Sequence, residues 1–295
     1  MVNKTSSVII AAIPLLLLSG TALSQNHGAR VGLLPTAEDA DNVVRKPSYS
    51  PYAGRNFPTS VYFGDTHLHT DNSLDAKGFG AVVDVEGAYR LARGGEVISN
   101  TGIPVKLSRP LDFLVVADHS DGMGAMKEIF KGNPNLLTDP TVRKWSKQMN
   151  AGGQEAFQAT MEVINAFSQG KIPAVVLDRE FQKTIWDDYV DLAEAYNEPG
   201  RFTAMIGYEW TSTEDGNNLH RNVLYRDDGD VARQVVPYTT AESFNPEDLW
   251  KWMERYEERT GGSVLTLAHN GNMSNGIMFP VERTRLPAND LALIT

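Results

Sequence analysis

The sequence of 295 residues contains no cysteine. Disulfide bonds and thiolate ligands are therefore excluded, and so is a lipid-modified cysteine at the N-terminus. Any metal ion that the chain binds must be held by nitrogen and oxygen ligands.

Positive charge is also scarce. The chain has 27 Lys and Arg residues against 37 Asp and Glu residues, which gives a net charge of -10. Non-specific binding to a nucleic-acid backbone depends on Lys and Arg that neutralise phosphates, so we expect no nucleic-acid partner. A phosphorylated small molecule remains compatible with this charge, because bound metal ions can reverse the local electrostatic field.

The apolar run from Val8 to Leu18 is shorter than the ~20 residues that a membrane-spanning helix needs. Lys4 precedes this run, and the small residues Ala22 and Ser24 follow it, as in a signal peptide that is cleaved after Ser24. We therefore expect residues 1–24 to be a signal peptide. The mature protein would be periplasmic or secreted, without a stable membrane anchor; an uncleaved anchor is the alternative.

The composition, 41% hydrophobic and 22% charged, is sufficient for a sizeable core. Residues 25–58 contain four prolines and scattered charges without a sustained period, which predicts an extended N-terminal arm. Residues 59–295 are expected to form the folded domain.

Segments with the patterns of strands and helices alternate along this domain. Strand and helix alternation of this kind predicts an α/β fold whose parallel strands are joined by helical crossovers. The expected strands are 61–67, 111–117, 202–208, 219–225 and 263–268, and the expected helices are 83–93, 139–168, 180–197 and 246–259.

Residues of metal-ligand type lie at the ends of four predicted strands. They are His67 and His69 at the end of strand 61–67, Asp118 and His119 after 111–117, Glu209 after 202–208 and His269 after 263–268. In a parallel barrel the carboxyl ends of all strands lie on one face. His67 and His69 are two residues apart, so both side chains point the same way. Asp75 and His220 can join them from adjoining segments.

Each of these residues alone has an ordinary interpretation. A His pair can bind backbone groups, Asp118 can cap a helix, Glu209 can pair with a cation, and His220 can lie at the surface. Five of the six histidines nevertheless fall at or beside strand ends, which favours a site. The ligand set suits Zn, Mn or Fe, and Glu209 could bridge two ions. Two ions about 3.5–4 Å apart would clamp a phosphate and activate water.

The motifs GDTHLHTDNSLD (64–75), VADH (116–119), IGYE (206–209), His220 and LAHN (267–270) resemble the polymerase and histidinol phosphatase (PHP) superfamily. Within this superfamily, four sequence motifs resemble those of the DUF3604 family: GDTHLHT, ADHSDGMG, GYEWTS and AHNGNMSNG. The resemblance covers roughly residues 61–280.

This resemblance implies a distorted (β/α)7 TIM-like barrel of the PHP type with two or three divalent metal ions. Members hydrolyse phosphate esters, so a phosphoesterase acting on a small phosphorylated molecule is implied. Carried over by motif, the ligands would be His67, His69 and Glu209 for the first ion, Glu209, His220 and His269 for the second, and Asp75 and His119 for a third.

The sequence departs from the superfamily at its end. Members usually close the site with an Asp-x-His motif on the last strand, and no such motif follows His269. We therefore expect a barrel that lacks its last strand or strands, as in a fragment of a longer chain.

Roles can be assigned as hypotheses. Glu209 would bridge the ions, and Asp65 or Asp118 would orient a ligand imidazole. Three further residues near the ligand positions are candidates for substrate contact: Arg221, Asn270 and Asn272. The alternatives are a hydrolase of another ester or amide class with the same ions, and a non-catalytic metal-binding remnant.

Overall fold

The computed structural model describes residues 60–279. They belong to the second of two units into which the chain divides, Ser60–Thr295. The expected signal peptide, the expected N-terminal arm and the segment after residue 279 lie outside the described residues. No helix in the described part is long and apolar enough to cross a membrane.

Three parallel strands form the first sheet, in the order β1 (Gly64–Leu68), β4 (Phe113–Val116) and β5 (Thr203–Met205). Gly64 is required for the close approach of β1 to β4, since a Cβ atom at this position would lie 2.3 Å from the Phe113 carbonyl oxygen. Helical segments connect these strands, as expected for parallel neighbours.

A second, antiparallel sheet contains β6 (Gly207–Trp210), β7 (Arg221–Tyr225) and β8 (Val264–Ala268), in that order. Ile206 alone separates β5 from β6. Beyond the end of β4, His119 forms a parallel bridge with Glu209 of β6. The chain from Thr203 to Trp210 therefore connects the two sheets.

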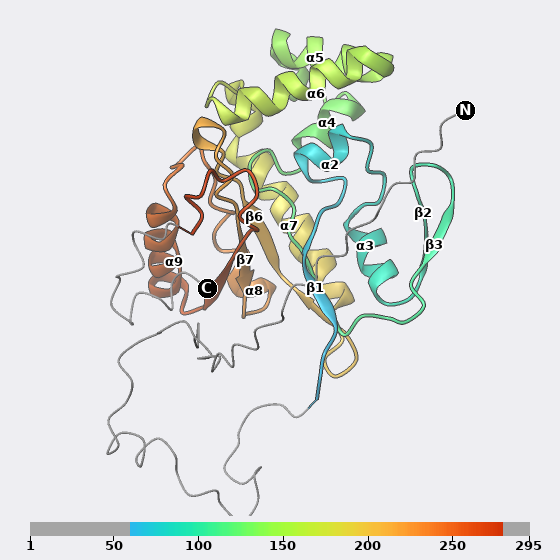
Figure 1. Ribbon diagram of the computed structural model, residues 1–295, viewed down its shortest axis with the longest axis vertical. Helices are drawn as coiled ribbons and strands as arrows, with labels where there is room; N and C mark the ends of the chain where they lie inside the picture. The colour runs from blue at the N-terminus through green and yellow to red at the C-terminus, as the bar shows by residue number, and fades with distance from the viewer. Residues whose placement is uncertain (1–59, 280–295) are drawn as a thin grey trace, which may run out of the picture. The chain divides into compact units, whose positions relative to one another are not determined.

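The predicted (β/α)7 barrel of parallel strands is wrong. The described residues form small separate sheets without a closed barrel, and β6, β7 and β8 run antiparallel. Residues 211–220 are fewer than the dozen or more that a parallel crossover needs, so β7 must return beside β6. A separate hairpin of β2 (Glu96–Ile98) and β3 (Pro104–Lys106), which the hydrophobic pattern did not predict, projects from the molecule (Figure 1).

One face of the strands packs on helices α3 (Val85–Ala92), α7 (Arg179–Tyr196), α8 (Gly229–Ala232) and α9 (Pro246–Thr260). Alternation along the strands directs Val116, Tyr208, Trp210 and Val223 into this main core, with Trp186 of α7 at its centre. The opposite face carries smaller clusters, such as that of Val115, Ala117 and Leu224. We call this opposite face the inner face.

A helical layer lies beyond the carboxyl ends of β1 and β4 (Figure 1). It consists of α2 (Leu74–Gly78), α4 (Ala125–Lys131), η1 (Leu136–Thr138), α5 (Pro140–Ala151), α6 (Gly153–Ser168) and η2 (Ala174–Leu177), and it has a core of its own. The single helix predicted over 139–168 is two helices, because Gly152 and Gly153 adopt positive φ angles of 77° and 55°. The caps predicted for α9 are confirmed: Asn245 accepts a hydrogen bond from the Glu247 amide, and Gly261 ends the helix at φ 73°.

Candidate metal centre

Every histidine of the described residues lies against the carboxylate of Glu209, which is fully buried. The nitrogen–oxygen distances are 3.0 Å for His119, 3.2 Å for His69, 3.3 Å for His67, 3.3 Å for His220 and 3.9 Å for His269. We call these five imidazoles and the Glu209 carboxylate the histidine cluster. The structure thus brings together six of the seven predicted metal ligands directly, and the seventh, Asp75, contacts His119 at 3.3 Å.

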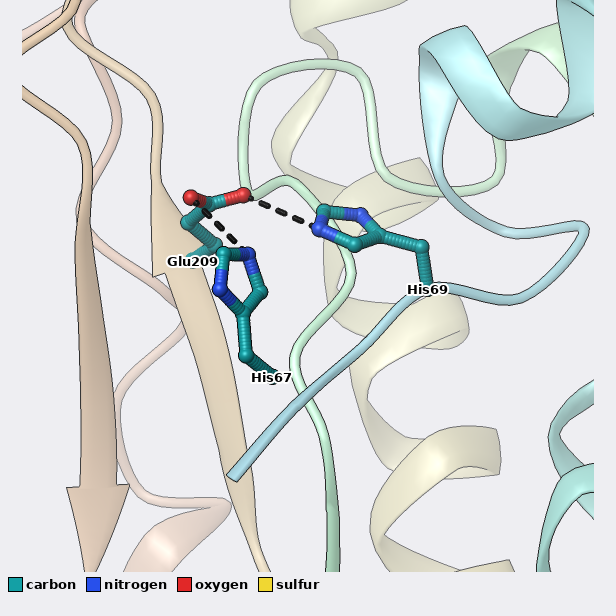
Figure 2. Close-up of side chains that lie close together, drawn as sticks. All are labelled: His67, His69 and Glu209. Atoms are coloured by element: carbon teal, nitrogen blue, oxygen red, sulfur yellow. Dashed lines mark ion pairs between the residues drawn. The ribbon is translucent and has the colours of Figure 1, made fainter. Parts of the chain in front are cut away.

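Strand alternation explains why β1 and β6 present their ligands to the same place. Leu68 packs against the main core, so His67 and His69 on either side of it point to the inner face. Tyr208 and Trp210 are likewise in the main core, which directs Glu209 to the inner face as well. Figure 2 shows the two imidazoles from the β1 segment pointing toward the Glu209 carboxylate.

β7 supplies its ligand from its beginning and not from its end. Because β7 runs antiparallel to β6 and β8, Arg221 at its start pairs with Trp210 and with Ala268. His220, just before β7, therefore lies at the same edge as His269, just after β8, and the His269 amide donates to the His220 carbonyl at 3.0 Å. The antiparallel sheet thus delivers the same ligands that a parallel arrangement was expected to deliver.

Within residues 60–279, three buried polar atoms of this cluster have no hydrogen bond to account for them. Both carboxylate oxygens of Glu209 and Nε2 of His220 are buried without a hydrogen-bond partner in the described residues. Two ligand atoms of a tetrahedral zinc ion, each about 2.0–2.1 Å from the metal, lie about 3.4 Å apart. The nitrogen–oxygen separations around Glu209 centre on that spacing, so the residues fit a shared cation.

Burial and close contacts between ionisable groups shift the pKa values of the cluster in the absence of metal. Burial opposes ionisation of Glu209, but contacts from His119, His220, His67 and His69 hold its pKa well below the usual range. Burial also disfavours a charged His119, yet the adjacent carboxylates of Asp75 and Glu209 raise its pKa to about 10. Burial lowers the pKa of His220, whereas the close contact with the Glu209 carboxylate raises that of His67. A cation would take over the role of the bound proton.

Three groups of side chains have ligand atoms close enough to hold an ion. They are His67, His69 and Glu209; His69, Asp75 and His119; and His119, Glu209 and His220. The first is the set expected for the first ion. The second adds His69 to the pair expected for a third ion. In the remaining group His119 takes the place expected for His269, which is the imidazole farthest from Glu209.

Two hydroxyl groups outside the predicted ligand set contact imidazoles of the cluster. Ser73 Oγ lies 2.6 Å from His69 Nδ1, and Thr211 Oγ1 lies 2.8 Å from His119 Nδ1. The outer partner of a ligating histidine fixes which ring nitrogen is free for the metal. Ser73 and Thr211 lie close in sequence to His69 and Glu209, and this closeness was the one sequence feature that could have identified them.

The carboxylates proposed to orient an imidazole have other contacts. Alternation turns Asp118 away from its neighbour His119, and it accepts hydrogen bonds from the amide and hydroxyl of Thr70 at 2.5 and 2.6 Å. Burial raises the pKa of Asp118. Asp65 accepts from the backbone amide of His67 at 2.8 Å. Both therefore hold the backbone that carries His67 and His69.

The three candidates for substrate contact lie in different surroundings. Arg221 pairs with Trp210, so its side chain leaves on the face opposite to Glu209; it is buried against Met278, and burial lowers its pKa to about 10. Asn270 and Asn272 lie in the exposed turn that follows His269, where the Asn270 side chain accepts from the Asn272 amide. Only these two remain beside the cluster.

Comparison with known proteins assigns the chain to a family. The model of a family described as "Protein of unknown function (DUF3604)" matches residues 56–292. This chain belongs to the DUF3604 family. The match spans all seven candidate ligands of this DUF3604 protein. Neither the curated proteins nor the solved structures contain a match to it.

Proposed function

We propose that this DUF3604 protein is an exported metal-dependent hydrolase, a phosphoesterase, with a centre of two or three divalent ions. The observation that carries the proposal is the convergence of all five described imidazoles on one buried carboxylate. Burying the Glu209 carboxylate with no hydrogen bond from the described residues to either of its oxygens is unfavourable unless a cation compensates it. The nitrogen and oxygen donors suit Zn, Mn or Fe.

Glu209 has the geometry of a bridging ligand. Its Oε1 faces His67, His220 and His269, whereas its Oε2 faces His69 and His119. Two oxygens that face different imidazoles can serve two ions at once. Glu209 would therefore set the spacing of the ions.

The cluster can be reached from solvent on one side. The side chains of Asp75 and His67 are 43% and 30% exposed, whereas those of His119 and His220 are 9% and 10% exposed. A substrate would therefore approach over β1 and α2. Bound ions would act there as Lewis acids and lower the pKa of water.

The motif resemblance to the PHP superfamily supports phosphate esters as the substrate class. The ligand set alone would serve other esters or amides equally well. Export is the part of the proposal that rests on the signal-peptide pattern of residues 1–24.

The test begins with metal content. The purified protein is stripped with a chelator, reloaded with Mn²⁺ or Zn²⁺, analysed by mass spectrometry, and assayed with p-nitrophenyl phosphate and bis-p-nitrophenyl phosphate. Glu209→Gln should lose both metal and turnover. Glu162→Gln is the matched control, because Glu162 pairs with Lys144 on the surface of the helical layer. Absence of metal in the wild type would overturn the proposal. Metal without turnover of any ester would leave a metal-binding protein, and turnover of sulfates or amides alone would change the substrate class.

A further inference from the structure

Asn222 is a buried amide on the inner face, directly beside Glu209 in the sheet. It pairs with Glu209 on one side and Leu267 on the other, and only 4% of it is exposed. Residues paired across antiparallel strands point to the same face, so Asn222 shares the side occupied by the histidine cluster. It lies outside the motifs that carry the family resemblance.

The Asn222 side chain reaches across the open side of the fold. Its Nδ2 donates to the backbone carbonyl of Thr66 in β1 at 2.9 Å. β1 pairs only with β4, and β7 only with β6 and β8, so no ladder joins β1 to the second sheet. Within residues 60–279 this is the one hydrogen bond between β1 and β7.

The bond acts on the peptide group that carries His67. The Thr66 carbonyl and the His67 amide belong to one planar unit. Asn222 donates to the oxygen of this unit, and Asp65 accepts from its N–H at 2.8 Å. With both ends held, the plane that sets the direction of the His67 side chain is fixed relative to Glu209.

We propose that Asn222 is a positioning residue, which ties β1 to β7 and thereby holds His67 at the bridging carboxylate. This inference rests on the proposed metal centre and deepens it. His69 depends less on the tie, because Ser73 holds its ring from the other side at 2.6 Å. Loss of the tie should therefore weaken the group of His67, His69 and Glu209 more than the group of His69, Asp75 and His119.

Two variants separate this role from alternatives. Asn222→Val keeps a strand-forming residue, removes the donor and also removes Oδ1, which is buried without a partner. Asn222→Asp keeps the shape but replaces the donor with an oxygen. We expect both variants to bind Mn²⁺ or Zn²⁺ 10–100-fold more weakly at one site, the range typical of outer partners of metal ligands, while a second site stays unchanged. Isothermal titration gives both affinities.

Asn197→Ala is the control. Asn197 accepts from the Ala204 amide at 3.2 Å, so it also makes a side-chain bond to a strand, but to β5 and not between β1 and β7. Its metal binding should equal that of the wild type. A readout that needs no metal is hydrogen exchange of β1 amides in the stripped protein, which should accelerate in Asn222→Val and not in Asn197→Ala.

The outcomes are distinct. Wild-type affinities and β1 exchange in both Asn222 variants would overturn the tie. Tighter binding in Asn222→Asp would also overturn it, because the residue would then be a direct oxygen ligand. A wild type that binds no metal, with accelerated β1 exchange in Asn222→Val, would refute the proposed function while leaving the tie itself intact.

Discussion

The backbones of His119 and Glu209 are locked to each other by two hydrogen bonds. The Glu209 amide donates to the Asp118 carbonyl at 2.9 Å, and the Ser120 amide donates to the Glu209 carbonyl at 2.8 Å. The contact between His119 Nδ1 and Glu209 Oε2 at 3.0 Å is therefore imposed by the sheet and not by flexible side chains alone. The proposed metal centre would be preorganised by this bridge. Its candidate ligands should contribute unequally, according to how many of the possible ion-binding groups each one belongs to.

Alanine at His119 should remove more metal than alanine at His269. His119 belongs to two of the three groups that could hold an ion, whereas His269 belongs to none of them. We expect His119→Ala to lower the bound metal per chain by about half or more, and His269→Ala to leave most of it. Elemental analysis of both folded variants checks this; a greater loss in His269→Ala would instead favour the ligand set drawn from the motifs.

Metal affinity should rise with pH between 6.5 and 9. Contacts with Asp75 and Glu209 raise the pKa of His119 to about 10 from an ordinary value of 6.5, so the metal-free protein holds a proton there at neutral pH. Stability from this raised pKa is fully present below pH 6.5 and is lost as the pH rises through 10. An ion must displace the proton, and this competition weakens as the pH rises.

Titration calorimetry at pH 7.5 in buffers of different ionisation enthalpy should therefore show net proton release on metal binding. The rise in melting temperature caused by the metal should also widen from pH 6.5 to pH 9. Affinity that is constant over this interval would mean that His119 is neutral in the metal-free protein.

The positions of β1, β4, β7 and β8 and the identity of the clustered residues were predictable from sequence, because apolar runs and strand ends are local features. The hairpin of β2 and β3 and the division of the strand predicted over 202–208 into β5 and β6 were not. His67 and His69 share a face with Glu209 as period-two alternation requires. The same rule would have shown that Asp118 faces away from His119 and that Arg221 faces away from His220. Whether a residue lies an even or an odd number of positions from a candidate ligand on the same strand predicts the direction of its side chain better than closeness in sequence does.

Strand direction was not predictable from these patterns. A buried apolar run has the same composition whether its neighbour is parallel or antiparallel, so β7 was placed in a parallel barrel. The length of the connection, residues 211–220, would have predicted the antiparallel direction, because it is too short for a parallel crossover. The candidate ligands still converge, because the start of an antiparallel strand lies beside the end of its neighbour. Arg221, which follows His220, pairs with Trp210, which follows Glu209, and the His269 amide donates to the His220 carbonyl.

Removal of the Tyr189 hydroxyl should destabilise the junction between the sheets. Tyr189 donates to the Val116 carbonyl and accepts from the Gly207 amide, both at 3.0 Å, in the interval where β4 and the β5–β6 segment are not paired. Tyr189→Phe leaves these two buried backbone groups without partners, at a cost of about 1–3 kcal/mol in the free energy of unfolding.

Tyr208→Phe is the comparison for this change, since Tyr208 is equally buried and also contacts Trp186, but its hydroxyl accepts only one bond, from the Tyr238 amide at 3.1 Å. Chemical denaturation should therefore show a smaller loss for Tyr208→Phe. Equal losses would indicate that the hydroxyl of Tyr189 does not bridge the strands in solution.

Replacement of Thr211 by valine should weaken metal binding where replacement by serine does not. The Thr211 hydroxyl donates its hydrogen to the Glu209 carbonyl at 2.9 Å, so it accepts from His119 Nδ1 at 2.8 Å. This leaves His119 Nε2, which lies 3.3 Å from Asp75, as the free ligand atom. Without the hydroxyl the ring can rotate or change tautomer, and affinity at the group of His69, Asp75 and His119 should fall about 10–100-fold.

Thr211→Ser retains the acceptor and should keep affinity near that of the wild type, so the two variants isolate the hydroxyl from the side-chain volume. Nitrogen-15 NMR of the metal-loaded protein supplies the decisive readout, because a hydrogen on Nδ1 of His119 should be present in the wild type and in Thr211→Ser. A hydrogen on Nε2 instead would contradict the assignment even if the affinities fell as expected, since the loss would then come from packing and not from the choice of ring nitrogen.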